Sequence, residues 1–199
     1  MSIFDRVEVR WLKRELSKPI DVRELSKLES SLIAARAQDV ANKIYSRESA
    51  LRPRPYQTVL SCCQLGELGE VAIAHRLRQA GMIVVENREE ITGNKYWDLT
   101  VENLKLEVKH QAEEDEGGQR RTFISFSSEE KIETARANRN FWDLMVCWRK
   151  IDNLVYPWYL TTTDAWGERF SQRSHYNTGY FIKMTMALNA REIVQLCKM

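Results

Sequence analysis

The sequence predicts a mixed α/β domain, because segments with helical spacing of apolar residues alternate with short apolar segments typical of strands. The 199 residues of the chain are enough for one well-buried core. Hydrophobic residues make up 43% and charged residues 29%, and there are only 8 glycines and 4 prolines. These values exclude a largely disordered, collagen-like or low-complexity chain.

Helical spacing of apolar residues predicts three helices before the first strand. A helix over 4–17 is expected to end before Pro19, and a second is expected to begin near Asp21. A third helix over 60–80 is expected to end at Gly81, because glycine readily adopts the positive φ that commonly follows a helix C-terminus.

The clearest break in the chain lies between the second and third predicted helices. The segment Leu51-Arg-Pro-Arg-Pro55 contains two prolines, and proline interrupts a helix because it lacks the main-chain N–H group. We therefore expect residues 1–55 to form an N-terminal helical extension and residues 56–199 to form the main domain.

Short apolar segments separated by turn residues predict strands through the rest of the chain. The expected elements are, in order, strands over 82–85, 96–101 and 104–109, a mobile acidic loop over 112–119, a strand over 121–126, a capped helix over 128–140, strands over 141–149 and 154–161, a short helix near 165–172, a strand over 179–186 and a final helix from Asn189.

The two strands around Glu102-Asn103 predict a hairpin in which Asn103 tolerates a positive φ. A two-residue turn places Val101 opposite Leu104, and the alternation of side chains then sets the two faces. The apolar face is expected to hold Trp97, Leu99, Val101, Leu104, Leu106 and Val108. The other face is expected to hold an acid–acid–lysine cluster, with Asp98 directly opposite Glu107 and with Lys109 beside them.

Directly opposed carboxylates repel one another, so we expect a positive charge to neutralise Asp98 and Glu107. Lys109 could supply it, or a divalent cation could bind Asp98, Glu107 and the main-chain carbonyl of Val108. Such an ion lowers the pKa of a bound water and neutralises charge that develops on a phosphate. Lys109 could then position or deprotonate the attacking water, or stabilise the transition state as a point charge.

Asp98 followed by Glu107-Val-Lys109 resembles the D…(D/E)xK signature of the PD-(D/E)xK nuclease superfamily. In that superfamily a helix before the strands commonly supplies a further acidic residue. Glu70, which follows Gly69, is similar in position, and Glu67 one turn earlier is the competing candidate.

The resemblance covers about residues 60–150 and implies a restriction-endonuclease-like core, a mixed β-sheet flanked by helices. It implies a Mg²⁺-dependent DNA endonuclease that hydrolyses phosphodiester bonds with a metal-activated water, with Mn²⁺ also supporting activity. The implied catalytic residues are Glu70, Asp98, Glu107 and Lys109, and the implied metal ligands are Asp98, Glu107 and Val108. The alternatives are a non-catalytic nucleic-acid- or partner-binding module with the same fold, and an RNA-cleaving nuclease.

The net charge of +2 is unevenly distributed along the chain. Residues 1–55 carry 12 basic and 8 acidic side chains, residues 56–118 carry 6 and 12, and residues 119–199 carry 12 and 8. Basic flanks around an acidic centre are typical of a protein that binds a polyanion and holds a metal ion. The expected partner is DNA, with a homodimer possible, and the candidate DNA-binding residues are Arg52, Arg54, Arg120, Arg121, Arg169 and Arg173.

The lack of a signal peptide and of a membrane-spanning segment predicts a cytoplasmic protein. The N-terminus is charged and lacks the apolar stretch of a signal peptide, and no uncharged stretch has the ~20 apolar residues that a membrane span needs. No glycine-rich phosphate loop is present, so we expect no nucleotide cofactor. The four cysteines include no CxxC pair, which argues against zinc binding and a disulfide framework.

The histidines and most aromatic residues are expected to be structural. His75 is expected on the solvent side of the third helix, and His110 at the end of a strand. The aromatic residues of the later strands are expected in the core rather than as base-stacking platforms. They are Trp142, Trp148, Trp158, Tyr159 and Tyr180.

Overall fold

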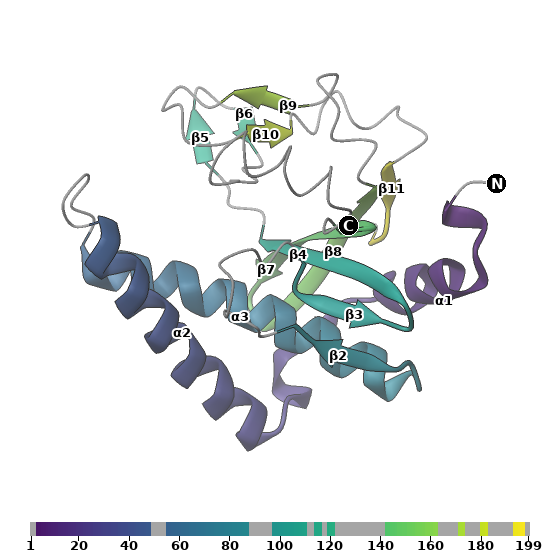
Figure 1. Ribbon diagram of the computed structural model, residues 1–199, viewed down its shortest axis with the longest axis horizontal. Helices are drawn as coiled ribbons and strands as arrows, with labels where there is room; N and C mark the ends of the chain where they lie inside the picture. The colour runs from purple at the N-terminus through teal and green to yellow at the C-terminus, as the bar shows by residue number, and fades with distance from the viewer. Residues whose placement is uncertain are drawn as a thin grey trace.

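The fold, given by a computed structural model, is a mixed α/β arrangement in which helices pack on a β-sheet (Figure 1). The prediction of an α/β fold is therefore confirmed. The structure describes residues 3–48, 55–87, 97–110, 114–116, 119–121, 142–162, 171–173, 180–182 and 193–197.

The three predicted N-terminal helices are confirmed with shifted bounds. They are α1 (Val7–Leu16), preceded by a 3-10 turn over Ile3–Asp5, α2 (Lys27–Glu48) and α3 (Tyr56–Gln79). α2 begins with a capping box, in which the Glu29 N–H donates to Ser26 Oγ at 3.2 Å and the Ser26 N–H donates to the Glu29 carboxylate at 2.7 Å. α3 is followed by Gly81 with a φ of 83°, as expected for a residue after a helix C-terminus.

The second helix begins later than Asp21, because the preceding residues belong to the sheet. Strand β1 (Ile20–Asp21) pairs with β8, and the Val22 N–H donates to the carbonyl of Asn153 at 2.8 Å. The Asp21 carboxylate then caps a 3-10 turn over Val22–Glu24 by accepting the Arg23 N–H. Because of these contacts, residues 20–24 do not join the helix, and α2 begins only after Ser26, which caps it.

The described strands form a seven-stranded mixed sheet in the order β1-β8-β7-β4-β3-β2, with β11 also paired to β8. β4 and β7 run parallel, and the other neighbouring strands run antiparallel. The bounds are β2 (Val84–Glu86), β3 (Leu99–Val101), β4 (Leu104–His110), β7 (Leu144–Ile151), β8 (Leu154–Thr162) and β11 (Ile193–Gln195).

The hairpin of β3 and β4 has the predicted register, with Val101 opposite Leu104. The turn differs in detail, because Glu102 rather than Asn103 has a positive φ, of 57°. Ile83 holds this conformation: its carbonyl accepts the Glu102 N–H and its N–H donates to Glu102 Oε1, both at 2.9 Å. Two hydrogen bonds thus offset the steric cost of a left-handed glutamate.

Several predicted elements elsewhere in the chain are wrong. The acidic loop 112–119 contains β5 (Glu114–Glu116), which pairs with β6 (Gln119–Arg121) around two glycines. β9 (Ser171–Arg173) replaces the end of the helix predicted near 165–172, and it pairs with β10 (Tyr180–Ile182). β11 replaces part of the predicted final helix, because pairing with β8 overrides local helical spacing. The helix predicted over 128–140 lies outside the described residues.

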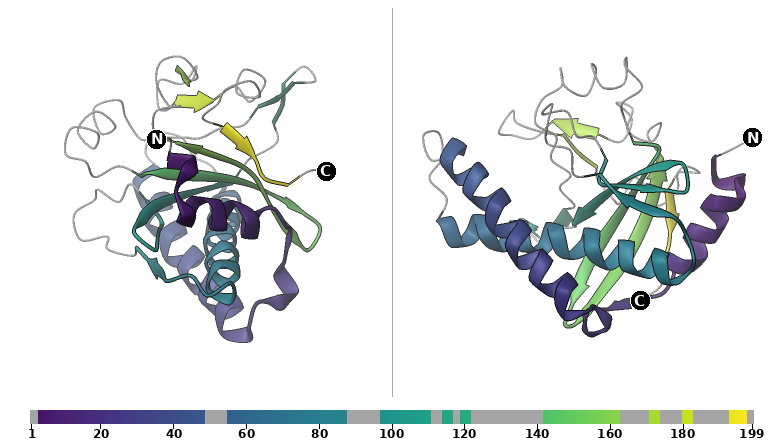
Figure 2. Two further views of the ribbon diagram at one scale, coloured as in Figure 1. Left: turned by 90° about the vertical axis from the view of Figure 1, so that its right-hand side faces the viewer. Right: turned by 60° about the horizontal axis from the view of Figure 1, so that its bottom comes forward.

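The hydrophobic core lies between the helices and one face of the sheet (Figure 2). Fully buried members include Leu12 of α1, Ile73 of α3 and Leu106 of β4. Because Val9, Leu16 and Ile20 also belong to this core, α1 and β1 are built into it; the domain boundary near residue 55 stays a prediction. Within the described residues, no helix has the length and apolar character to cross a membrane.

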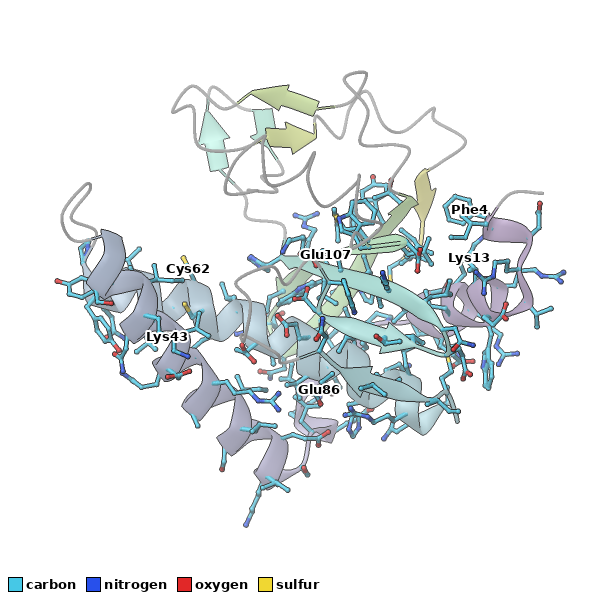
Figure 3. All side chains as sticks on the ribbon, viewed as in Figure 1. Phe4, Lys13, Lys43, Cys62, Glu86 and Glu107 are labelled. Atoms are coloured by element: carbon cyan, nitrogen blue, oxygen red, sulfur yellow. The ribbon has the colours of Figure 1, made fainter. Side chains whose placement is uncertain are left out.

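Ion pairs at the edge of the sheet also connect β2 to the helices that cover this face. Glu86 of β2 pairs with Arg36 of α2 at 2.7 Å and with Arg78 of α3 at 3.0 Å (Figure 3). Glu86 lies opposite Leu99, whose side chain is in the core. Side chains of the opposite parity on β2, β3 and β4 therefore project from the other face of the sheet, on which the described helices do not pack, although Glu107 on it is buried. We call this the open face.

Candidate active site

The hairpin places the predicted carboxylates and the lysine together. On β4, Leu106 and Val108 belong to the hydrophobic core, so Glu107 and Lys109 project from the open face. Asp98 directly precedes β3. The side chains of Asp98 and Glu107 are buried, with residue exposures of 8% and 5%. Asp98, Glu107 and Lys109 therefore form the acid–acid–lysine cluster predicted from the alternation of side chains. Glu107 is labelled in Figure 3.

The carboxylate of Asp98 is fixed by the main chain of the neighbouring strand. Its Oδ2 accepts a hydrogen bond from the Val108 N–H at 2.8 Å, and its own N–H donates to the Leu106 carbonyl at 3.0 Å. A side-chain oxygen thus takes the place of a main-chain acceptor where the β3–β4 ladder ends. This contact holds the Asp98 carboxylate against the Glu107–Lys109 segment.

Lys109 supplies positive charge to the carboxylates. Its ammonium forms an ion pair with Glu107 Oε1. Burial opposes the charged form of Lys109, but the charges of Glu107, Asp98 and Glu70 outweigh burial and raise the pKa of Lys109 above its ordinary value. Lys109 therefore neutralises part of the negative charge of the carboxylate cluster.

α3 brings a third carboxylate toward this cluster. Glu70 acts electrostatically on Lys109 and helps to raise its pKa, and Glu67, one turn earlier on α3, is buried at 7% exposure. Glu70 and Glu67 both stay candidates for the helix acid, and the electrostatic effect on Lys109 favours Glu70. Its neighbour Gly69 lies directly against the indole of Trp148 on β7, so this contact sets the position of α3 on the sheet.

The expected metal site is only partly assembled by described side chains. Among these residues, no group of three or more His, Cys, Asp or Glu side chains is arranged to hold a metal ion. Asp98 and Glu107 are nevertheless the hard oxygen donors that Mg²⁺ prefers, and this ion usually keeps several waters. The pair therefore fits a divalent cation that has few protein ligands. The predicted role of the Val108 carbonyl stays a prediction.

A buried thiol next to Lys109 was not singled out by sequence reasoning. Cys147 of β7 lies beside Lys109 in the parallel register, and its Sγ is 3.9 Å from Met145 Sδ. Burial raises the pKa of the Cys147 thiol to about 12, against a smaller opposing effect of Lys109. The thiol is therefore neutral near pH 7. The four cysteines of the chain are free thiols.

Trp97 does not lie in the apolar face of the hairpin, and this prediction is wrong. Its indole Nε1 donates to Thr100 Oγ1 at 3.2 Å, and Lys105 Nζ lies 4.4 Å from its ring centroid. Thr100 and Lys105 are paired across the open face. Because β3 begins at Leu99, the strand alternation does not extend back to Trp97.

His75 is also not on the solvent side of its helix. It lies between α3 and α2, where its Nδ1 is 2.8 Å from Glu29 Oε1 and its side chain is 15% exposed. His110 ends β4 as expected, with its ring edge-on to Trp148 at a centroid distance of 4.7 Å. Burial lowers the pKa of His110, and the charge of Lys150 adds to this effect.

Most aromatic residues of the later strands are buried, as predicted. Trp142, Trp148 and Tyr159 are almost inaccessible to solvent. Trp158 is partly exposed, with the Arg149 guanidinium 4.7 Å from its ring centroid. The side chain of Tyr180 is outside the described part of the chain.

The predicted DNA-binding arginines are not described as side chains. Arg52, Arg54 and Arg169 lie outside the described residues. Arg120 and Arg121 belong to β6 and Arg173 to β9, where the main chain alone is described. Their contact with DNA stays a prediction.

Comparison of the chain with models of known protein families gives no match. Comparison with curated proteins gives no match either.

Proposed function

We propose that this chain is a Mg²⁺-dependent DNA endonuclease of the PD-(D/E)xK type with a restriction-endonuclease-like core. The observation that carries the proposal is the Lys109 ammonium paired with buried Glu107 and within the electrostatic reach of Asp98 and Glu70. Further support comes from the order of elements, since α3 precedes the β3–β4 hairpin and β7 lies parallel to β4.

In the proposed site each residue has a distinct role. Asp98 and Glu107 hold Mg²⁺ or Mn²⁺, which supplies an activated water and neutralises charge on the phosphate. The raised pKa of Lys109 keeps its side chain positively charged near neutral pH. Lys109 positions or deprotonates the attacking water, or stabilises the developing charge on the phosphate oxygens as a point charge. Glu70 completes the site from α3.

Cleavage assays test the proposal directly. Supercoiled plasmid DNA, a four-way junction and RNA are incubated with the protein in Mg²⁺ and in EDTA. We expect metal-dependent cleavage of DNA that is lost in Glu107→Gln. The control Asp39→Asn changes an exposed carboxylate on α2 and should cleave like the wild type. Cleavage of RNA alone, or undiminished cleavage in EDTA, would contradict the proposal.

One observation favours a second candidate, a non-catalytic nucleic-acid- or partner-binding module. In the part of the chain that the structure describes, Lys109 already neutralises Glu107, and no three metal-ligating side chains are gathered. Such a module would bind DNA or a partner without cleaving DNA under any metal condition. The same assays, combined with a binding measurement, therefore separate the two candidates.

The basic flanks predict a steep salt dependence of DNA binding. If residues 1–55 and 119–199 contact the DNA backbone, binding should release counterions from several phosphates. The logarithm of the association constant should then fall with the logarithm of salt concentration with a slope of roughly −4 to −8. Fluorescence anisotropy between low and physiological ionic strength measures this slope. A flat dependence would argue against a backbone-binding role for these flanks.

A further inference from the structure

Trp97 lies at the edge of the proposed site, immediately before Asp98, and two hydrogen bonds hold it there. Its carbonyl accepts a hydrogen bond from Asn87 Nδ2 at 3.2 Å, and its indole N–H donates to Thr100 Oγ1 at 3.2 Å. Because the carbonyl and the indole N–H of Trp97 are bound within the protein, the ring surface is the part of this side chain that can contact a ligand. The residue is partly exposed rather than buried.

The surroundings of this ring combine apolar surface with positive charge. Val85, Thr100 and Lys105 pair across the open face on β2, β3 and β4. Val85 is 58% exposed, and the Lys105 ammonium lies 4.4 Å from the centroid of the Trp97 ring. Because the Lys105 ammonium lies over one face of the ring, a base would stack on the opposite face while its phosphate contacts the ammonium, and this combination suits a nucleotide.

We propose that Trp97 and Lys105 form a nucleotide-binding element that takes an unpaired base next to the phosphate to be cleaved. The proposal rests on the proposed nuclease function and specifies its substrate class as DNA with single-stranded character. A base inside a duplex is covered by its neighbours, so it contacts a side-chain ring only after unstacking, which costs free energy. An unpaired nucleotide avoids this cost, and the element therefore favours single-stranded DNA over duplex DNA.

The position of Trp97 connects the element to the chemistry. Trp97 is joined covalently to Asp98, and Lys105 lies two residues before Glu107 on the same face of β4. A nucleotide stacked on Trp97 is thereby held close to the carboxylates that would bind the metal ion. Trp97 is a substrate-binding residue in this arrangement, and the reaction itself is left to Asp98, Glu107 and Lys109.

The test measures binding in EDTA, where no cleavage is expected. Fluorescently labelled single-stranded DNA, the corresponding duplex and RNA of the same sequence are titrated at one fixed salt concentration. Trp97→Ala should weaken the binding of single-stranded DNA by about 5- to 100-fold, which is the effect of losing one base-stacking contact. Duplex binding should change by less than about threefold, because phosphate contacts dominate it.

Three further variants keep the result interpretable. Trp97→Phe retains a ring and should bind single-stranded DNA within a few-fold of the wild type, and thermal melts confirm that each variant is folded. Tyr56→Ala removes a partly exposed ring at the start of α3, outside the proposed site and outside the basic flanks, and should leave binding unchanged. Lys105→Met should reduce the log–log salt slope for single-stranded DNA by about 0.7.

The outcomes separate this inference from the proposed function. Equal binding of single-stranded DNA by Trp97→Ala and the wild type, with metal-dependent DNA cleavage intact, would overturn the inference alone. Tighter binding of RNA than of single-stranded DNA would overturn the assignment of DNA as the substrate class. A selective loss of single-stranded binding in Trp97→Ala supports the element even if the wild type fails to cleave DNA, in which case only the nuclease function fails.

Discussion

Replacing Gly69 with alanine should destabilise the protein by about 3 kcal/mol, although alanine is the better helix former. A Cβ at this position would overlap the indole ring of Trp148, which is fully buried on β7. The indole has no space to retreat into solvent, so either α3 or β7 must shift. Overpacking of this kind typically costs 1–3 kcal/mol and sometimes more, which exceeds the gain of about 1 kcal/mol in helix propensity.

Gly66 provides the matched control on the same helix. A Cβ at Gly66 meets no atom within 4 Å, so Gly66→Ala should stabilise the protein by up to about 1 kcal/mol through helix propensity alone. Urea denaturation of both variants measures the two effects on the free energy of unfolding. If Gly69→Ala and Gly66→Ala change stability in the same direction, the close packing of α3 on Trp148 does not require glycine at position 69.

The hairpin could be predicted because its register is decided locally. A two-residue turn and alternating apolar residues leave one pairing that buries a complete face, and Val101 does pair with Leu104. The same alternation placed Glu107 and Lys109 on one face. Features that depend only on residues within about ten positions of one another could therefore be predicted without a structure.

Contacts between distant segments explain the failures. β11 and β1 are strands because each pairs with β8, and no pattern within these short segments specifies that partner. His75 is covered by α2, whose packing against α3 cannot be read from the third helix alone. Trp97 was assigned to the core because the alternation was extended two residues past the point where β3 begins.

Within the candidate site, the sequence predicted the acidic residues and the lysine but left their interactions open. Lys109 and a metal ion were equally acceptable partners for the carboxylates, and Glu67 and Glu70 were both acceptable as the helix acid. These interactions depend on side-chain positions, which bring Glu107, Asp98 and Glu70 within electrostatic reach of Lys109. The metal ion and the identity of the helix acid stay predictions.

Removing the charge of Lys109 should strongly destabilise the metal-free protein. In Lys109→Met the side chain keeps a similar length, but buried Glu107 loses its ion-pair partner. Removing one partner of a buried ion pair costs about 3–5 kcal/mol, and we expect about 2–3 kcal/mol here because the Lys109 side chain is 29% exposed. The free energy of unfolding in EDTA measures this loss.

A double-mutant cycle with Glu107→Gln isolates the ion pair from other effects of the substitutions. The double variant Glu107→Gln/Lys109→Met should be more stable than the sum of the single effects predicts, by about 1–3 kcal/mol. Additive effects would mean that the two side chains do not interact. Thr58, which lies on α3 and is exposed, offers a control: Thr58→Ala combined with Lys109→Met should be additive.

The pH dependence of this stabilisation follows from the direction of the Lys109 pKa. The pKa is raised in the folded state above the ordinary value of 10.5, so the folded protein binds the proton more tightly than the unfolded chain does. The stability difference between the wild type and Lys109→Met should therefore be constant as the pH rises from neutrality to about 10.5. It should decrease at higher pH, where the unfolded chain releases the lysine proton while the folded protein still holds it, and it should be lost once the folded protein also releases that proton.

The same variant shows whether the carboxylates accept a metal ion in place of the ammonium. A ligand that binds the folded state stabilises it by RT ln(1 + [L]/Kd), so Mg²⁺ or Mn²⁺ should raise the melting temperature of a protein that binds it. In Lys109→Met the ion meets negative charge that Lys109 no longer offsets, so the increase should exceed that of the wild type. Glu107→Gln should lose most of the increase. If neither metal changes the melting temperature of Lys109→Met, Asp98 and Glu107 do not form a cation site, and the proposed metal-dependent chemistry fails with it.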